Sequence, residues 1–184
     1  YDDLYADPIA WMEGKYIDYM LPQLYWSIDH KTASYSKLIK WWAENSSNAN
    51  VYIGNGSYKI KNDSDKKWFI PGEITNQIDL TRTYPNIQGN AYYSAKYFVN
   101  NNKDVTSLLI NNQYKYPAIP LPVPSNIKIG NERPLILAFQ AEENSYQFSF
   151  KKTQSDQIRY IVVYSTENNM RLDSNDPSQI VEKV

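Results

Sequence analysis

The sequence of 184 residues contains no cysteine and a single histidine, His30. Disulfide bonds and thiolate metal ligands are therefore excluded, and this chain alone cannot build a histidine-rich metal site. Neither charge predominates, because 19 lysines and arginines stand against 20 aspartates and glutamates. Without a basic surplus that would follow a phosphate backbone, we expect no nucleic-acid partner. No apolar run approaches the roughly 18 residues of a membrane span, and we expect no metal and no organic cofactor.

Tyrosine is unusually frequent, with 17 copies in a chain that is 15% aromatic. Asparagine is also abundant. Both residue types are common on surfaces that bind sugars, but they are also common on bacterial surface proteins of other kinds. Composition therefore leaves the function open, and the order of residues along the chain has to decide it.

Strand-like and helix-like patterns alternate over the first 116 residues. Strands favour β-branched and aromatic residues with a period of two, whereas helices show apolar residues three and four apart. Pro22 lies inside the first strand and predicts a bend near its carboxyl end. We expect strands over residues 16–25, 51–53 and 89–93, the end of a helix over 2–14, and helices over 34–42, 71–84 and 104–111. Strand followed by helix, three times, predicts βα units and a parallel sheet.

The helix predicted after Ser34 carries two adjacent tryptophans. Ser34 is a suitable N-cap residue. Apolar residues three and four apart then form a stripe, which comprises Tyr35, Leu38, Ile39, Trp41 and Trp42. We interpret Trp41 and Trp42 as core residues rather than ligand contacts. Residues 61–67, by contrast, are mainly charged and are expected to be solvated.

Polar or aromatic side chains follow each of the three predicted strands. In a βα barrel the active site is built at the carboxyl ends of the strands, whereas the opposite face serves stability. We therefore treat these ends as one site, formed by Gln23, Tyr25 and Trp26, by Asn55, Ser57 and Tyr58, and by Ser94 and Lys96. Gly54 and Gly56 permit a close backbone approach to a ligand, although a plain loop explains them equally well.

Polar and aromatic residues of this kind are the composition of a sugar or peptide site, and for a sugar the expected contacts are these. Tyr25, Trp26 and Tyr58 are expected to stack on the C–H faces of pyranose rings, although Tyr25 and Trp26 would also suit the end of a core. Expected hydrogen-bonding partners for hydroxyl or N-acetyl groups are Gln23, Asn55, Ser94 and Lys96. Lys96 either binds in this way or is a solvated amine. His30 either carries a proton near neutral pH or has a structural role.

Carboxylates are scarce near the strand ends. Asp29 follows a predicted strand end closely. Glu73 is expected near the start of a helix, where an acid favours the helix dipole.

The chain changes character between residues 117 and 124, where prolines recur. This pattern predicts a stiff, extended linker and a domain boundary. Beyond it the apolar period becomes two, which is typical of sandwich strands with one buried face. The alternating residues are Ile127, Ile129, Leu135, Leu137, Phe148, Phe150, Ile158, Tyr160, Val162 and Tyr164. We expect an α/β domain over residues 1–116, the linker over 117–124, and antiparallel β structure over 125–184.

Four blocks of the first domain have a recognisable order and spacing. They are residues 17–26 (IDYMLPQLYW), the pair Trp41 and Trp42, residues 51–54 with 58–60 (VYIG and YKI), and residues 88–96 (QGNAYYSAK). Together they resemble the bacterial glycosyl-hydrolase-like family 10. The resemblance extends over about residues 8–115, and the tail from residue 124 resembles the start of the family's sandwich domain.

The resemblance implies a TIM-barrel glycosidase followed by a fibronectin type III-like domain. It further implies a secreted, periplasmic or outer-surface lipoprotein of the bacterial cell envelope. This chain would hold barrel strands six to eight and part of the sandwich, as a C-terminal fragment. Glycoside hydrolysis normally needs two carboxylates that flank the scissile bond, and the family's acidic pair is expected upstream, at strands four and five. By this resemblance, Asp29 is a candidate helper in catalysis. This chain is then expected to contribute substrate binding rather than nucleophilic attack. The open edge of the sheet would then be covered by the upstream half of the barrel or by another chain.

Three functions remain open from the sequence. The first is a fragment of a glycoside hydrolase acting on a bacterial polysaccharide, such as the glycan strands of peptidoglycan. In this case the fragment contributes substrate binding and is inactive alone. The second is a non-catalytic carbohydrate-binding or adhesion protein that kept the barrel and lost the acids. The third is a structural scaffold whose sandwich docks a partner.

Overall fold

The computed structural model describes residues 3–99, 104–119, 135–141, 146–151, 161–167 and 170–183. The chain divides into two compact units, Tyr1–Lys115 and Tyr116–Val184. Helices and a parallel sheet make up the described part of the first unit, and antiparallel strand pairs occur in the second.

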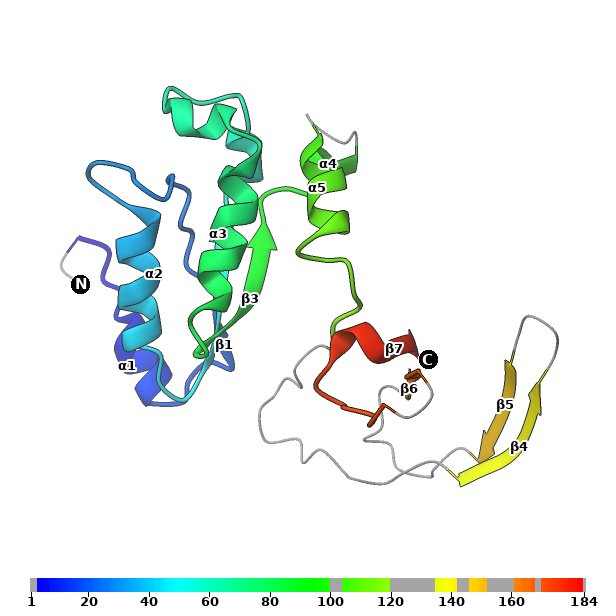
Figure 1. Ribbon diagram of the computed structural model, residues 1–184. Coiled ribbons are helices and arrows are strands. Elements are labelled where there is room, and N and C mark those ends of the chain that lie inside the picture. Colours follow the sequence, from blue (N-terminus) through cyan, green and yellow to red (C-terminus); the bar gives the residue numbers. More distant parts are fainter. Residues whose placement is uncertain are drawn as a thin grey trace. The chain divides into compact units, whose positions relative to one another are not determined.

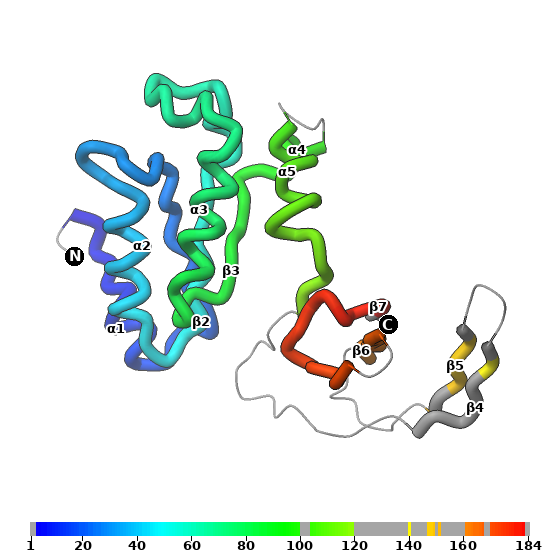
Figure 2. Tube along the Cα trace, in the orientation of Figure 1, coloured from blue at the N-terminus to red at the C-terminus, as the bar shows by residue number. Residues whose placement is uncertain are grey.

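The first unit contains a parallel sheet of three strands in the order β1-β2-β3. The strands are β1 (Tyr19–Met20), β2 (Asn50–Asn55) and β3 (Ile87–Tyr92), and the helices are α1 (Pro8–Glu13), α2 (Tyr35–Glu44), α3 (Gly72–Arg82), α4 (Lys96–Val99) and α5 (Val105–Asn111). Two short 3-10 helices, η1 (Ser57–Lys59) and η2 (Lys66–Phe69), lie between β2 and α3. A helix separates each strand from the next, as the trace in Figure 2 shows. The predicted mixed α/β arrangement with a parallel sheet is confirmed.

Strand β1 is much shorter than its sequence pattern suggests. It pairs with β2 over two residues, so the predicted strand over residues 16–25 is wrong at both ends. Pro22 has no N–H to donate and interrupts the regular ladder. Its carbonyl still accepts a hydrogen bond from Gly54 N at 2.8 Å, and Leu24 N donates to Gly54 O at 2.9 Å. Pairing with β2 therefore resumes beyond the proline, as a single bridge between Gln23 and Gly54.

Helices α2 and α3 lie side by side against the sheet (Figure 1). Ser34 is the N-cap of α2, as predicted. One turn apart along this helix, Tyr35, Ile39 and Ala43 are buried and share the main core with residues of α1, β2 and β3. A second core links α3 with α5 and comprises Ile60, Trp68, Ile74, Ile78, Val105 and Leu109. On α3, the side chains of Ile74, Ile78 and Thr81 are buried.

The assignment of Trp41 to the core is wrong, because its side chain is 45% exposed. Each residue of a helix turns by about 100°, so two adjacent tryptophans cannot both lie on one narrow stripe. Trp42 lies beside the core stripe and packs partly against it, whereas Trp41 makes an edge-to-face contact with Trp42 at 5.0 Å. Sequence patterns missed Trp68, which directly follows a charged segment and is only 1% exposed.

The second unit contains two antiparallel strand pairs among its described residues. Strand β4 (Leu135–Ala141) pairs with β5 (Tyr146–Lys151), and β6 (Val162–Tyr164) pairs with β7 (Ile180–Lys183). A 3-10 helix, η4 (Pro177–Gln179), precedes β7. The expected change from parallel to antiparallel pairing is therefore seen. Residues 120–124 of the predicted linker, and the predicted strand residues Ile127, Ile129, Ile158 and Tyr160, lie outside the described residues.

Candidate functional site

Backbone hydrogen bonds tie together the segments that leave the carboxyl ends of β1, β2 and β3. Beyond the Gln23–Gly54 bridge, Tyr93 N donates to Asn55 O at 3.0 Å, and Tyr58 N donates to Tyr93 O at 3.2 Å. We call these segments, residues 23–26, 55–58 and 93–94, the carboxyl edge. Their side chains come from distant parts of the sequence but share one end of the sheet.

Three tyrosines from the carboxyl edge form a cluster. The rings of Tyr25 and Tyr93 are stacked with centroids 6.4 Å apart, and Tyr58 meets both edge-on, at 5.8 and 6.0 Å. Gly56 lies against this tyrosine cluster, since a Cβ atom there would come within 3.3 Å of Tyr25 and Tyr58. Tyr93 is 63% exposed. Burial, together with the neighbouring phenols of Tyr58 and Tyr93, raises the pKa of Tyr25, which therefore stays protonated at neutral pH.

Beneath the edge, side-chain amides form a hydrogen-bonded chain, which we call the amide chain. Asn90 Nδ2 donates to Asn55 Oδ1 at 2.8 Å, and Asn55 Nδ2 donates to Gln77 Oε1 at 2.9 Å. Gln77 Nε2 then donates to the backbone carbonyl of Trp26 at 3.1 Å. The amide chain thus connects β3, the end of β2 and the segment after β1 through a side chain of α3.

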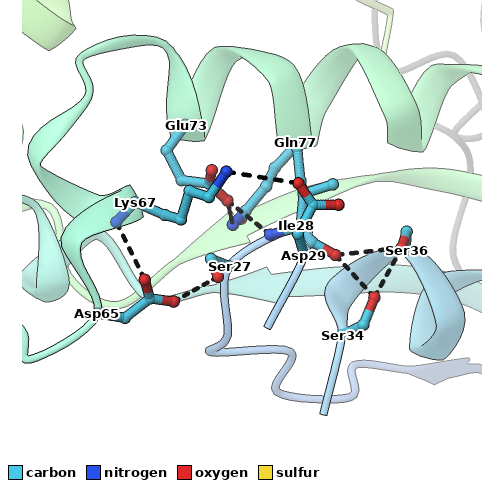
Figure 3. Close-up of polar contacts among 9 residues, drawn as sticks. All are labelled: Ser27, Ile28, Asp29, Ser34, Ser36, Asp65, Lys67, Glu73 and Gln77. Carbon is cyan, nitrogen blue, oxygen red and sulfur yellow. Dashed lines mark hydrogen bonds and ion pairs between the residues drawn. The ribbon is translucent and has the colours of Figure 1, made fainter. Parts of the chain in front are cut away.

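Glu73 of α3 binds the segment that follows β1, at Ile28 (Figure 3). Its Oε1 accepts hydrogen bonds from Ile28 N at 2.8 Å and from Gln77 Nε2 at 2.9 Å. The residue is 7% exposed. Burial raises the pKa of Glu73, against the opposing effect of these two hydrogen bonds, and the nearby carboxylates of Asp65 and Asp29 raise it further.

Charged side chains that are more exposed than Glu73 lie near it. Ser27 Oγ donates to Asp65 Oδ2 at 2.5 Å, and this bond is the main reason why the pKa of Asp65 is lowered. Asp29, the predicted catalytic helper, has a side chain that is 71% exposed and lies 3.6 Å from Lys67 Nζ (Figure 3). Its observed partner is therefore a surface lysine.

The structure brings some of the predicted site residues together. Tyr25 and Tyr58 are in contact within the tyrosine cluster, Gln23 is exposed at the sheet end, and Trp26 is 37% exposed. Ser94 joins the edge through its carbonyl, which accepts a hydrogen bond from Ser57 Oγ at 3.3 Å.

Three other predicted residues have different surroundings. Asn55 is fully buried and uses its amide within the amide chain, so its side chain supports the edge from inside. His30 Nδ1 accepts a hydrogen bond from Ala33 N at 3.2 Å, which fits the structural role considered for it. Lys96 is exposed, with its ammonium 5.1 Å from the ring centre of Tyr97.

Comparison with known proteins identifies the family. A family model described as "Glycosyl hydrolase-like 10" matches residues 1–70, a range that includes β1 and β2. The chain is 32% identical over 173 residues to glycosyl hydrolase YngK of Bacillus subtilis (strain 168). It is 36% identical over 104 residues to glycosyl hydrolase DigH of Escherichia coli (strain K12). The chain belongs to the glycosyl hydrolase-like 10 family.

Both matches cover only part of the relatives. The aligned region comprises 91% of this chain but 34% of YngK. For DigH the corresponding shares are 53% and 24%. This chain therefore spans about a third of the length of the first glycosyl hydrolase and about a quarter of the second.

Sequence reasoning missed three residues of the site in this glycosyl hydrolase-like chain. Tyr93 was placed in a strand, yet it follows the strand end in the same way as Tyr25 and Tyr58 and could have been found by that rule. Glu73 and Gln77 looked like ordinary helix residues. Their signal is a spacing of four that continues to Thr81, next to the apolar pair Ile74 and Ile78, and all three polar residues are buried.

The described residues show no candidate metal centre. Among them, no group of three or more histidine, cysteine, aspartate or glutamate side chains is arranged to hold a metal ion. None of the helices in the described ranges is long and apolar enough to cross a membrane.

Proposed function

We propose that this chain is part of a glycoside hydrolase that acts on a bacterial polysaccharide, and that its carboxyl edge binds the glycan. The observation that carries the proposal is the tyrosine cluster at the ends of parallel strands, where βα proteins build their sites. Aromatic rings present a negative face to the mildly positive C–H groups of a pyranose. A protonated phenol such as Tyr25 also donates and accepts hydrogen bonds, which suits sugar hydroxyls. The names of YngK and DigH support the reaction class.

The proposed parent fold is a TIM barrel, to which this chain contributes strands six to eight. Support comes from the run of parallel βα units and from the sheet face that points away from α2 and α3. Because strand residues alternate between faces, Tyr52 lies opposite the buried Val51 and Ile53, and it contacts Tyr19, which is 53% exposed. Preceding strands of the complete protein would cover this face, and the antiparallel pairs would belong to a fibronectin type III-like domain. A location in the bacterial envelope, secreted, periplasmic or as a lipoprotein, is part of the same proposal.

The catalytic carboxylates are proposed to lie outside this chain. Hydrolysis needs two carboxyl groups about 5–10 Å apart on either side of the glycosidic bond. Glu73 is buried and hydrogen-bonded to Ile28 and Gln77, and Asp29 pairs with Lys67. In this proposal, the aromatic residues Tyr25, Trp26, Tyr58 and Tyr93 bind sugar rings, and Gln23, Ser94 and Lys96 are retained as polar contacts.

A non-catalytic carbohydrate-binding or adhesion protein is the alternative. The specific observation in its favour is the composition of the carboxyl edge, whose described segments 23–26, 55–58 and 93–94 contain no carboxylate. A binding protein needs only the aromatic and hydrogen-bonding groups that are present.

Two assays on the complete protein separate these possibilities. Binding to a panel of soluble glycans, including N-acetylglucosamine oligomers, tests the sugar site, and release of reducing ends tests hydrolysis. We expect binding and hydrolysis by the complete protein, no hydrolysis by the 184-residue chain alone, and turnover little changed by Asp29→Asn. Binding without hydrolysis by the complete protein favours the alternative. Hydrolysis by the isolated chain that is abolished by Asp29→Asn contradicts the assignment of roles.

A further inference from the structure

We infer that Gln77 is a positioning residue of the proposed glycan site, holding the Trp26 segment in register with the ends of β2 and β3. The inference rests on the proposed function, because it concerns how that site keeps its shape. Gln77 lies on α3, far from the carboxyl edge in sequence, and its side chain is fully buried. It is therefore unable to touch a glycan, and any effect it has on binding acts through other residues.

The amide of Gln77 is fixed by three partners. Nε2 donates one hydrogen bond to Trp26 O at 3.1 Å and another to Glu73 Oε1 at 2.9 Å. Oε1 accepts from Asn55 Nδ2 at 2.9 Å. A side-chain amide has two N–H donors, so both donors are in use. Rotating the amide by 180° would place its oxygen against two acceptors and its nitrogen against a donor, leaving buried groups unpaired.

Asn55 connects the amide of Gln77 to the rest of the sheet. Its second Nδ2 bond goes to the hydroxyl of Tyr35 at 3.2 Å, and its Oδ1 accepts from Asn90 at 2.8 Å. The side-chain amides of Gln77 and Asn55 therefore each have only one orientation in which all their hydrogen bonds are made. The position of the Trp26 carbonyl is consequently coupled to the end of β2 and to β3.

The same three segments carry the aromatic residues of the edge. Tyr25 immediately precedes Trp26, Tyr58 follows the end of β2, and Tyr93 follows the end of β3. A second bond from α3, between Ile28 N and Glu73, holds the segment after Trp26. The amide chain thus adds side-chain bonds to the backbone bonds that join these segments, and it does so in a region where β1 provides only a two-residue ladder.

Apolar packing also holds α3 in place, against α5 in the second core. Ile74 and Ile78 lie next to the polar residues and are each 1% exposed. Polar groups buried beside such a stripe contribute to a defined arrangement more than to net stability, because desolvation offsets most of their hydrogen-bond energy. A positioning role predicts that removing Gln77 changes glycan affinity by more than its effect on stability would suggest.

The test compares Gln77→Leu with the matched variant Thr81→Val in the complete protein. Thr81 is equally buried on the same polar stripe. Its hydroxyl bonds to Tyr35, to the Gln77 carbonyl and to Asn90 Nδ2. It does not contact the Trp26 segment, and Asn90 keeps its bond to Asn55 when the hydroxyl is removed. The readouts are the dissociation constant for a soluble N-acetylglucosamine oligomer and the fluorine NMR signal of fluorotryptophan at Trp26, assigned with Trp26→Phe. The melting temperature of each variant is recorded alongside.

We expect Gln77→Leu to weaken oligomer binding about tenfold, which corresponds to roughly 1.4 kcal/mol, and to shift or broaden the Trp26 signal. Thr81→Val should keep wild-type affinity and an unchanged Trp26 signal at a comparable loss of melting temperature. If Gln77→Leu does not fold, Gln77→Met provides the same test, because it keeps the unbranched shape of the side chain and removes the donor to Trp26 without burying a charge beside Glu73.

Other outcomes separate the inference from the proposed function. Wild-type affinity in Gln77→Leu, together with weak binding by Tyr93→Ala, overturns the positioning role and leaves the glycan site standing. An equal loss of affinity in Thr81→Val also overturns it, because the effect would then reflect stability. If the wild-type complete protein binds none of the glycans in the panel, the proposed function fails and the positioning role fails with it.

Discussion

Glu73 Oε1 accepts a hydrogen bond from the backbone N–H of Ile28, 45 residues earlier in the chain, at 2.8 Å. Because Glu73 lies in the first turn of α3, the expected role of its carboxylate was an interaction with the helix dipole. Its actual contacts fasten the segment after β1 to α3. The bond therefore explains why a carboxyl group remains in a position that is only 7% exposed.

The burial of Glu73 predicts a specific dependence of stability on pH. Because its pKa in the folded protein is raised above 4.5, folding favours the neutral form. Its contribution to stability is complete below pH 4.5 and is lost as the pH rises through the folded pKa. Glu73→Gln stays neutral and keeps an oxygen that accepts from Ile28. We therefore expect its free energy of unfolding, relative to wild type, to increase as the pH rises from 4 to 8.

Urea unfolding of both proteins at a series of pH values measures this difference. Contributions from other carboxyl groups, such as Asp65 with its lowered pKa, occur in both proteins and largely cancel. A difference that stays constant, or that falls as the pH rises, contradicts the assigned environment of Glu73.

The two tryptophans Trp68 and Trp41 should respond very differently to truncation. Trp68 is 1% exposed within the second core, so Trp68→Ala should lower the free energy of unfolding by about 3–5 kcal/mol. Trp41 is 45% exposed, and Trp41→Ala should cost less than about 1 kcal/mol. Thermal or chemical denaturation provides the comparison. A larger loss for Trp41→Ala would restore the interpretation of Trp41 as a core residue.

Gly54 is predicted to accommodate a side chain only at a cost in stability. A Cβ atom there would lie 3.1 Å from the Pro22 carbonyl oxygen and 3.3 Å from Gln23 Cα. These are backbone atoms that cannot move without disturbing the bridge between β1 and β2. Gly54→Ala should therefore destabilise the protein by about 1–3 kcal/mol.

Gly72 is the control for this substitution. Its Cβ atom would come no closer than 3.6 Å to a neighbouring side chain, at the first residue of α3. Gly72→Ala should therefore be neutral, or stabilising by up to about 1 kcal/mol. Equal effects of the two substitutions would show that the close approach at Gly54 is not what restricts the position.

The sequence predicted the helices of the first unit better than it predicted which of their side chains are buried. Tyr35 and Ile39 follow a helical spacing after an N-cap serine, and local patterns of this kind identified α2 and its buried side. Trp41 misled because hydrophobicity is a property of the residue, whereas burial depends on the angle at which the helix presents it. The approach of Gly54 to Pro22 depends on two strands meeting, which no single segment reveals.

The residues of the candidate site were also predicted only in part. Tyr25 and Tyr58 were found because they directly follow strand ends, and parallel strands bring their ends together. Asn55 was selected by the same rule, but its amide turns inward to Gln77. Whether a polar residue at a strand end faces solvent or a buried partner depends on the helix packed beneath it. That helix contributes Gln77 and Glu73, which are close to the edge only in space.

The most direct test of the account is the affinity of the complete protein for a soluble glycan after substitution of Tyr93. This residue belongs to the tyrosine cluster and is 63% exposed, so Tyr93→Ala should fold normally. With a glycan from the panel that binds the wild type, isothermal titration should give a loss of about 1 kcal/mol for Tyr93→Ala and for Trp26→Ala, the contribution typical of one aromatic contact. Trp41→Ala, which alters an exposed aromatic residue on α2, should bind as the wild type does. Unchanged affinity in Tyr93→Ala and Trp26→Ala, or an equal loss in Trp41→Ala, would contradict the proposal that the carboxyl edge binds the glycan.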